Sequence, residues 1–258
     1  MKHGYLVGTI DVALLAFLAF VLFFIVLVFW LRREDRREGY PLEDELTGRL
    51  ESIGGPMLTA TAKRFILPFG RGTVTAPTAP NVGREPVDIA AKRFENFAGA
   101  PYVPTGNPLA DGVGPGAYAQ RAKWPDQDAH GRNRIVPLAS AEGISVYSGN
   151  VDPRGLKVIG ADGKVAGTVS ELWVDRAEHI IRYLEVATNG GRSVLAPMAM
   201  ASIGRGSVSI DAINAADFEG VPALGTAGEI TRYEEERIVG YFGGGYLYAN
   251  TDRQEPWL

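Results

Sequence analysis

The sequence VALLAFLAFVLFFIVLVFWL, residues 12–31, decides how the rest of the chain is organised. It contains no charged side chain, no amide, no Gly and no Pro. As a helix rising 1.5 Å per residue it covers about 30 Å, which is the thickness of the hydrocarbon core of a bilayer. It is apolar on every face, whereas the buried helix of a soluble protein normally shows a polar stripe. The stretch therefore predicts a single transmembrane helix.

A cleaved signal peptide is the alternative interpretation of this stretch. The apolar core of such a peptide is usually about 7–15 residues long, and a cleavage site between small residues follows it. Here the apolar run is longer, and it ends in a dense block of charged residues from Arg32 to Glu38. A charged block of this kind is typical of a stop-transfer signal, so we favour the membrane anchor.

The charges on either side of the stretch predict its orientation. Lys2 precedes it, whereas four arginines follow it: Arg32, Arg33, Arg36 and Arg37. Since positively charged residues remain in the cytoplasm, the N-terminus is expected outside and the large domain inside. Trp30 lies at the cytoplasmic end, where an indole suits the headgroup layer. We expect Trp30 and the four arginines to lie at the membrane interface, where the arginines could also hold anionic lipid.

The overall composition excludes several classes of site. The 258 residues include no Cys, so disulfides and thiolate metal sites are excluded. The three His are scattered, at positions 3, 130 and 179, without the spacing of a metal site. A net charge of −4 gives no basic excess for nucleic acid. No catalytic motif is present, so we expect a protein that is not an enzyme.

The residues after the charged block begin with a loop-rich region. Residues 38–143 show little periodicity and contain several Pro and Gly clusters. Short strands are expected at residues 65–67 and 73–75, on either side of a turn at 69–72. The region carries many aromatic side chains, which argues against disorder. We therefore expect it to lie extended on the surface of a partner protein, between an anchor at residues 1–37 and a domain at residues 144–258.

Residues 144–258 predict a mainly-β domain that ends in a helix. Asp162-Gly163 and Asn189-Gly190-Gly191 are hairpin turns between apolar segments. The expected strands are residues 156–159, 164–169, 169–174, 180–187, 193–196 and 208–213. Short strands at this spacing are typical of a small barrel or strongly bent sheet. A helix is expected from Thr231, with an interruption or close packing at Gly243-Gly244-Gly245.

Three stretches in combination carry a resemblance to a known family. They are LRREDRREGYPL at residues 31–42, PTGNP followed by DGVGP within residues 104–115, and GKVAG, LWVD and RYLEV within residues 163–186. Together they resemble the H subunit of the photosynthetic reaction centre of purple bacteria, over nearly the whole chain. The first two stretches are specific to that family. The third is the broader PRC-barrel pattern, which also occurs in soluble proteins.

The resemblance implies a fold, a location and partners. The fold would be a single transmembrane α-helix plus a cytoplasmic, mainly-β, PRC-barrel-like domain with a C-terminal helix. The location would be the bacterial inner (photosynthetic intracytoplasmic) membrane, with the N-terminus periplasmic. The chain would cap the L and M subunits, with light-harvesting antenna and membrane lipids around the complex. Bacteriochlorophyll, bacteriopheophytin, quinones and non-haem iron would be held by the partner subunits and none by this chain.

The resemblance also implies a role in assembly, in shielding the quinones from water, and in conducting protons to the secondary quinone. Asp128 and His130 match the region where protons enter, and Glu178 matches a buried inner carboxylate, with Asp175 near it. In some members of the family a second His occupies the position of Arg132. This sequence therefore departs from a proton-entry region with two His. Arg132 would also disfavour protonation of His130.

From the residues alone, plainer interpretations of these side chains stay open. Glu178 and Arg182 would form an ordinary ion pair at a turn, and Asp128 and His130 would be solvated side chains in a polar loop. A different function also stays open, namely a membrane-tethered PRC-barrel adaptor that binds a soluble protein or RNA. That hypothesis predicts a domain from about Ile144 that folds and works alone.

Overall fold

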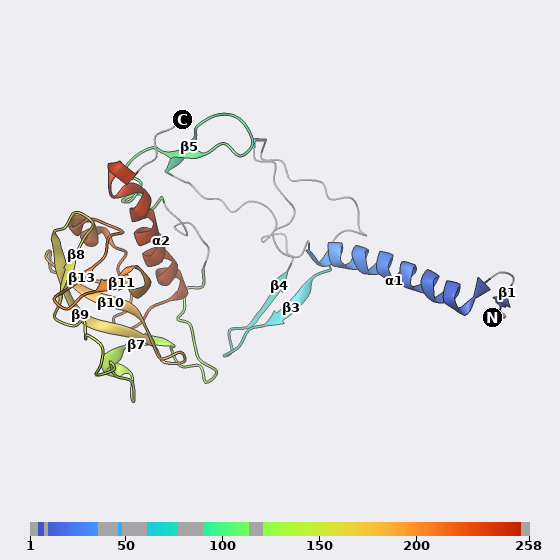
Figure 1. Ribbon diagram of the computed structural model, residues 1–258, viewed down its shortest axis with the longest axis horizontal. Coiled ribbons are helices and arrows are strands. Elements are labelled where there is room, and N and C mark those ends of the chain that lie inside the picture. The colour runs from blue at the N-terminus through green and yellow to red at the C-terminus, as the bar shows by residue number, and fades with distance from the viewer. Residues whose placement is uncertain are drawn as a thin grey trace. The chain divides into compact units, whose positions relative to one another are not determined.

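The computed structural model describes residues 5–7, 10–35, 46–47, 61–76, 90–113 and 121–253 (Figure 1). The chain forms two compact units. One comprises residues 1–86 and 95–100, and the other comprises residues 87–94 and 101–258.

The first unit contains the predicted apolar helix, α1, at Val12–Asp35. Strands β1 (Tyr5–Val7) and β2 (Ile10–Asp11) pair in front of it, and the Asp11 carboxylate accepts a hydrogen bond from the Leu14 N–H at 2.8 Å. This contact satisfies one of the N–H groups that a helix leaves unpaired at its start. No residue of α1 is buried in the chain by itself. Among the described residues, α1 is the one helix long and apolar enough to cross a bilayer.

The first unit also contains a β-hairpin. Strands β3 (Lys63–Ile66) and β4 (Thr73–Ala76) pair antiparallel, as predicted. The turn between them is left-handed at Phe69, where φ is 59°, and at the two glycines on either side of Arg71. Glycine adopts this conformation without steric cost, which explains the Gly-Arg-Gly sequence at the tip.

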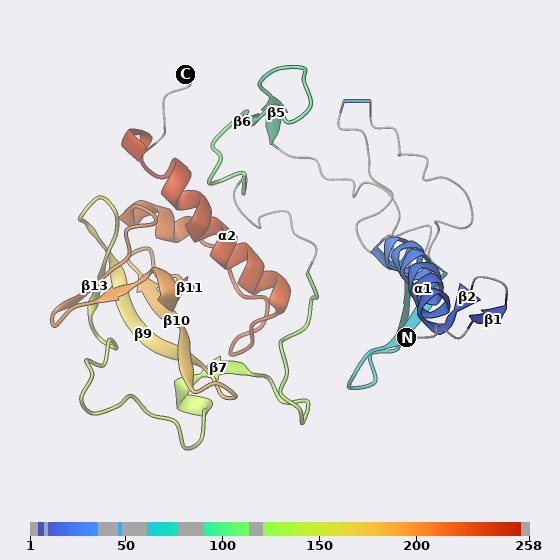
Figure 2. The ribbon, with the colours of Figure 1, turned by 45° about the vertical axis from the view of Figure 1, so that its right-hand side comes forward.

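The second unit is built on a seven-stranded sheet. Its strands are β7 (Ile135–Pro137), β8 (Lys157–Ile159), β9 (Val165–Asp175), β10 (Ile180–Thr188), β11 (Ser193–Pro197), β12 (Ser202–Ile203) and β13 (Ser207–Ser209). The order is β11-β10-β9-β8-β13-β12, and β7 pairs with the end of β9 beyond β8. Figure 2 shows the long strands β9 and β10 side by side. Register shifts in β9–β10 bend the sheet.

The two predicted hairpins of this sheet are confirmed. Strands β8 and β9 pair antiparallel around Asp162-Gly163, and β10 and β11 pair antiparallel around residues 189–191. The strand predicted at residues 208–213 is wrong in its extent, since β13 ends at Ser209. Beyond β13 the Ile210 N–H still donates to the Ile159 carbonyl of β8, and Ala212 and Ile213 are buried against the C-terminal helix.

Several short elements complete the second unit. Strands β5 (Ala91–Arg93) and β6 (Tyr102–Pro104) form a two-stranded ladder. Short 3₁₀-helices are η3 (Leu138–Ser140), η4 (Met198–Met200), η5 (Ala215–Gly220) and η6 (Thr251–Arg253). Strand β7 belongs to the region predicted as loop-rich, so the sheet takes in residues upstream of 144. The three-region division remains a prediction.

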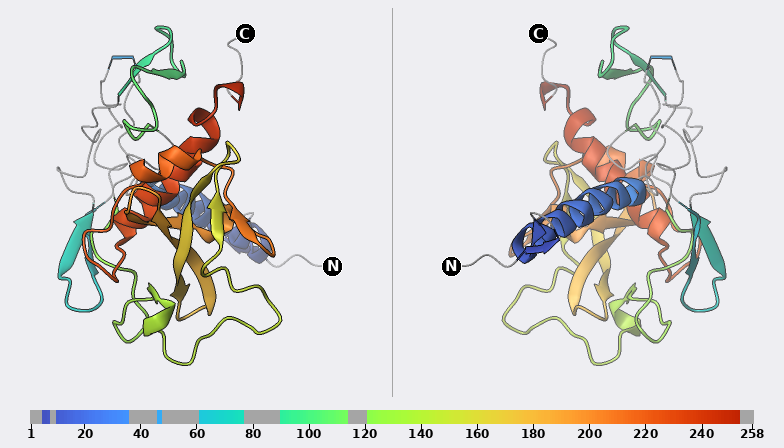
Figure 3. Two further views of the ribbon diagram at one scale, coloured as in Figure 1. Left: turned by 90° about the vertical axis from the view of Figure 1, so that its left-hand side faces the viewer. Right: turned by 90° about the vertical axis from the view of Figure 1, so that its right-hand side faces the viewer.

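The C-terminal helix α2 runs from Arg232 to Tyr248. Its predicted start is confirmed by a capping box. The Thr231 hydroxyl accepts a hydrogen bond from the Glu234 N–H at 3.1 Å, and the Glu234 carboxylate accepts one from the Thr231 N–H at 2.7 Å. The helix packs on the sheet beside β11 (Figure 3). Phe242 is fully buried there, edge-to-face with Phe218 at 5.7 Å between ring centroids.

The Gly243-Gly244-Gly245 run does not interrupt α2. Gly245 instead serves close packing, because a Cβ atom there would lie 2.5 Å from the Ala212 carbonyl oxygen and closer still to the Ile213 side chain. Of the two outcomes predicted for this stretch, close packing is the one that the structure shows.

Replacing Gly245 by Ala is therefore expected to destabilise the protein, although Ala favours helix by about 1 kcal/mol. The added methyl group would force α2 away from backbone atoms, which typically costs about 1–3 kcal/mol. Chemical unfolding of the full chain in detergent measures the effect. Gly206→Ala is the control, because a Cβ atom there would meet nothing within 4 Å. Equal unfolding midpoints for the two variants would contradict the packing role of Gly245.

Candidate functional site

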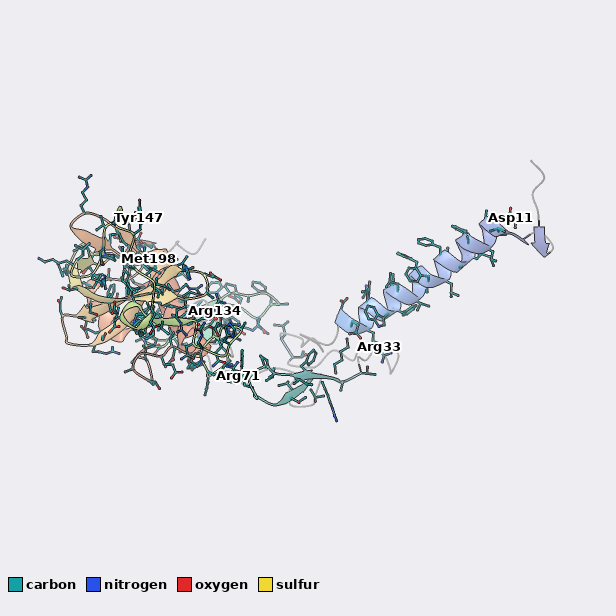
Figure 4. All side chains as sticks on the ribbon, turned by 90° about the horizontal axis from the view of Figure 1, so that it is seen from below. Asp11, Arg33, Arg71, Arg134, Tyr147 and Met198 are labelled. Atoms are coloured by element: carbon teal, nitrogen blue, oxygen red, sulfur yellow. The ribbon has the colours of Figure 1, made fainter. Side chains whose placement is uncertain are left out.

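A polar cleft of about 480 Å³ lies in the second unit, where β7, β9 and β10 meet the first half of α2. Its lining residues are Arg121, Asp126, Arg134, Ile135, Asp175, Glu178, Arg182, Tyr183, Arg232, Glu235, Glu236 and Val239. Five are carboxylates and four are arginines, so opposite charges nearly balance. Figure 4 labels Arg134 among the side chains of this unit.

Arg134 is the centre of the cleft. Its guanidinium lies 2.6 Å from one Asp175 oxygen, 2.8 Å from Glu178 and 3.3 Å from Asp126. Hydrogen bonds to Glu178 and then to Asp175 raise the pKa of Arg134, so it stays charged. One cation thereby holds three carboxylates together.

Asp175 is the buried member of this group, with only 3% of its side chain exposed. It ends β9, and its Oδ1 atom accepts hydrogen bonds from the Ala177 and Glu178 N–H groups at 2.9 and 3.2 Å. The pairing of Ile135 with Asp175 across β7 and β9 places Arg134 beside it. Charge pairing and backbone donors together compensate the removal of this carboxylate from water.

Asp126 links the loop before β7 to α2. Its carboxylate pairs with Arg232 in the first turn of the helix as well as with Arg134. Burial acts to raise the pKa of Asp126, but the hydrogen bond and charge of Arg232 outweigh it. The pKa therefore lies below its usual value, and Asp126 stays ionised near neutral pH.

Glu235 is a carboxylate of the cleft whose pKa lies above its usual value. Burial raises the pKa of Glu235, and the Tyr183 hydroxyl (3.1 Å) and the Arg182 guanidinium (3.8 Å) offset only part of that effect. The cleft thus holds carboxylates in contrasting environments, which is a feature of sites that move protons.

A tight loop extends from the cleft. Its base is closed by the Arg134 N–H, which donates to the Asp126 carbonyl at 2.8 Å, and by the bridge between residues 127 and 133. At its tip Asp128 accepts hydrogen bonds from the N–H groups of Arg132 and His130 and pairs with the Arg132 guanidinium at 2.8 Å. The Arg132 backbone N–H is the largest of the effects that lower the pKa of Asp128 to about 2.

The described residues contain no cluster of three or more His, Asp or Glu that could hold a metal ion. The five carboxylates that line the cleft provide groups suited to acid–base exchange.

Comparison with protein families matches two parts of the chain. The description "Photosynthetic reaction centre, H-chain N-terminal region" fits residues 4–140, which is more than half of the chain, and "PRC-barrel domain" fits residues 147–217. The chain belongs to the photosynthetic reaction centre H-chain family. The H chain is a non-catalytic structural subunit of a reaction centre, whose cofactors generally reside in the partner subunits. The predicted fold class is confirmed by the single apolar helix, the PRC-barrel sheet and the C-terminal helix.

The four proton-transfer candidates of this H chain fall in two places. Asp175 and Glu178 both line the cleft, and Arg134 brings them together. Asp128 and His130 lie outside it, at the tip of the loop whose base is Asp126 and Arg134.

Two details predicted for Glu178 differ in the structure. The expected ion pair between Glu178 and Arg182 is wrong. In the described part of the chain Glu178 pairs with Arg134, and Arg182 pairs with Glu235. Two features direct the Glu178 and Arg182 side chains to different partners. One is the turn at His179, where φ is 56°, and the other is the register shift between Ile181 and Tyr183. In the chain by itself, 53% of the Glu178 side chain is exposed, because it stands on the turn between β9 and β10.

The predicted membrane-interface residues lie at the C-terminal end of α1. Trp30 is exposed, and Arg32 and Arg33 form the last turn. Arg36 and Arg37 lie outside the described residues.

Sequence reasoning missed the residues that assemble the cleft. Arg134, Asp126 and Glu235 carry no local motif, and Arg134 meets two of its carboxylates across 41 and 44 residues. Glu235 belongs to the Glu234-Glu235-Glu236 run, and acidic residues suit the start of any helix, so the run by itself does not point to a site. The signal that could have found Glu235 is its position one turn inside α2, on the same face as the apolar Ile238 and Phe242.

Proposed function

We propose that this H chain caps the L and M subunits on the cytoplasmic side, supports their assembly, shields the quinones from water and conducts protons to the secondary quinone. The observation that carries the proton-conducting role is the cleft around Arg134, in which four chain segments contribute charged groups to one water-accessible space.

The proposed route begins at the loop tip and ends at the cleft. Asp128 remains ionised near neutral pH, so its negative charge attracts protons to the loop tip. His130 lies beside Asp128 and is the proposed group that passes these protons on. The base of the same loop is Asp126 and Arg134. Arg134 keeps its own proton and fixes Asp175 and Glu178 in reach of one another. Glu178, half exposed on its turn, is the proposed donor toward the partner subunits.

The rest of the proposed function concerns the surroundings of the chain. The α1 helix would hold it in the photosynthetic intracytoplasmic membrane of a bacterium, with the N-terminus periplasmic and the sheet domain cytoplasmic. The predicted loop-rich region, residues 38–143, would lie on the L and M subunits. Those subunits would hold bacteriochlorophyll, bacteriopheophytin, quinones and non-haem iron, with light-harvesting antenna around the complex.

The adaptor alternative requires a domain that starts near Ile144 and folds alone. Strand β7 and Arg134 both precede that point, and the buried Asp175 depends on Arg134. No observation specific to a soluble protein or RNA partner favours the adaptor.

Replacing Glu178 by Gln in the assembled reaction centre is expected to slow proton-coupled second electron transfer to the secondary quinone by at least about tenfold. This is less than the usual contribution of one positioned proton donor to the rate of a reaction. Gln keeps the shape and can still accept a hydrogen bond from Arg134, but it cannot release a proton. Flash spectroscopy with a pH-indicating dye measures transfer and proton uptake together.

Glu142→Gln is the matched control, because Glu142 is exposed and does not line the cleft. Unchanged second electron transfer in Glu178→Gln, with the complex intact, would remove Glu178 from the route. First electron transfer, which needs no proton from this route, should be the same in both variants.

A further inference from the structure

The hairpin β3–β4 has one face with a composition unlike the sheet domain. Cross-strand pairing sets Arg64 opposite Thr75 and Ile66 opposite Thr73. Because side chains alternate along a strand, these four residues share one face. They line a hollow of about 420 Å³ that contains a guanidinium, two hydroxyl groups and one aliphatic side chain.

Apolar side chains of this hairpin are open to solvent in the chain by itself. Ile66 is 85% exposed, and Phe65, Phe69 and Val74 are each exposed by more than two fifths. Phe65 and Val74 pair on the face opposite to Ile66, so both faces of a hairpin too small to have a core of its own carry exposed apolar groups.

The hairpin is also uniformly basic. Residues 61–76 contain Lys63, Arg64 and Arg71 and no acidic residue. The Arg71 guanidinium lies 5.6 Å from the centre of the Phe69 ring at the tip. Basic groups interleaved with exposed apolar groups are typical of segments that lie in the interface of an anionic membrane.

An ion pair connects the base of the hairpin to the C-terminal end of α1. The Lys63 ammonium lies 2.6 Å from the Glu34 carboxylate. Glu34 follows the last apolar residue, Leu31, by three positions, which places it about 4.5 Å beyond the end of the hydrocarbon core. The headgroup layer on each side is about 5–8 Å thick. The base of the hairpin is therefore at headgroup level, and Figure 4 labels Arg33 on α1 and Arg71 on the hairpin of this same unit.

We propose that the β3–β4 hairpin is a second membrane contact, in which the Arg64 guanidinium and the hydroxyls of Thr73 and Thr75 bind the phosphate of an anionic lipid and Ile66 enters the acyl boundary. The inference rests on the membrane placement proposed above for α1, and it places residues 63–76 on lipid, apart from the rest of the loop-rich region that we propose lies on the L and M subunits. A guanidinium with neighbouring hydroxyl donors matches the oxygens of a phosphodiester, and a carbon side chain beside them matches the glycerol and first methylenes. The contact would fix the rotation of the chain about α1, which the helix alone leaves free.

The chain has no Cys, so a single probe can be placed without altering other residues. The test attaches a nitroxide to Ile66→Cys in the full-length chain, held in nanodiscs of phosphatidylcholine with phosphatidylglycerol or of phosphatidylcholine alone. A nitroxide that is accessible to oxygen lies in lipid, and a nitroxide that is accessible to a nickel chelate lies in water. Tyr147→Cys, on an exposed loop of the other unit, is the control site.

The proposal expects high oxygen and low nickel accessibility at Ile66→Cys in the anionic discs, and the opposite at Tyr147→Cys. Adding Arg64→Gln, or omitting phosphatidylglycerol, should each shift the probe toward water. Each basic residue near an anionic leaflet changes the bound-to-free ratio by roughly fivefold. The Arg64→Gln change should therefore be of that size, and it should vanish in the neutral discs.

Two outcomes would overturn the proposal. Nickel accessibility equal to that of Tyr147→Cys would leave the hairpin in water. A probe in assembled reaction centres that is shielded from both reagents, whatever the lipid, would assign the hairpin to a protein surface. Loss of the chain from the nanodiscs would instead refute the anchoring role of α1, so failure of the anchor and failure of the hairpin contact are distinguishable.

Discussion

Replacing Arg134 by Met is expected to lower the free energy of unfolding by about 3–5 kcal/mol, the usual effect of removing one partner from a buried charge pair. Met keeps much of the volume of the side-chain stem but leaves Asp175, which is 3% exposed, without its cation. Asp126 and Glu178 lose the same partner. Chemical unfolding of the full chain in detergent, followed by near-ultraviolet circular dichroism, measures the change.

Arg132→Met is the matched control for this prediction. Arg132 also pairs with an aspartate at 2.8 Å, but 65% of its side chain is exposed, and exposed pairs contribute about 0–1 kcal/mol. The double variant Arg134→Met with Asp175→Asn should recover part of the loss, because it removes the buried charge along with its partner. If Arg134→Met unfolds no more easily than Arg132→Met, the cleft does not depend on its central cation.

Truncating Phe242 to Ala is expected to destabilise the protein by about 3–5 kcal/mol. The ring is fully buried between α2 and η5, edge-to-face with Phe218, and α2 rests on the sheet beside β11 through this region. The loss combines the transfer free energy of the ring with a cavity that the sheet cannot collapse to fill. Thermal and chemical unfolding of the full chain both report it.

Val239→Ala is the control on the same helix, since Val239 is 41% exposed and its truncation leaves little or no cavity. Its expected effect is below about 1 kcal/mol. A similar loss in the two variants would mean that α2 is held by its capping and ion pairs rather than by the packing of its buried face.

The features predicted correctly from the sequence all have local signals. The apolar run predicted α1 by its length, Asp-Gly and Asn-Gly-Gly located two hairpins, and the start of α2 was predicted at Thr231. In each case the residues that form the element are also the residues that identify it.

The features that were missed depend on contacts between distant segments. Strand β7 is three residues long and ends in Pro137, and it exists because β9 offers a free edge beyond β8. The partners of Arg134 lie 8, 41 and 44 residues away, so no spacing rule could assemble them. Glu178 and Arg182 have the spacing of an ordinary ion pair, but the turn and the irregular register of β10 separate them.

Because β8 pairs in parallel with β13, residues near 158 cannot complete the sheet until residues near 208 have been synthesised. Chains emerge at about 5–20 residues per second, so β8 and β9 wait several seconds with an open edge after their own hairpin has formed. By then α1, far upstream, has already left the ribosome. On the membrane placement proposed for α1, insertion would precede closure of the sheet, and the half-built sheet would be tethered to the membrane during the interval. Exposed strand edges are the sites at which incomplete chains pair with one another. Such tethering would keep incomplete chains apart, so the order of elements along this chain would itself reduce aggregation during biosynthesis.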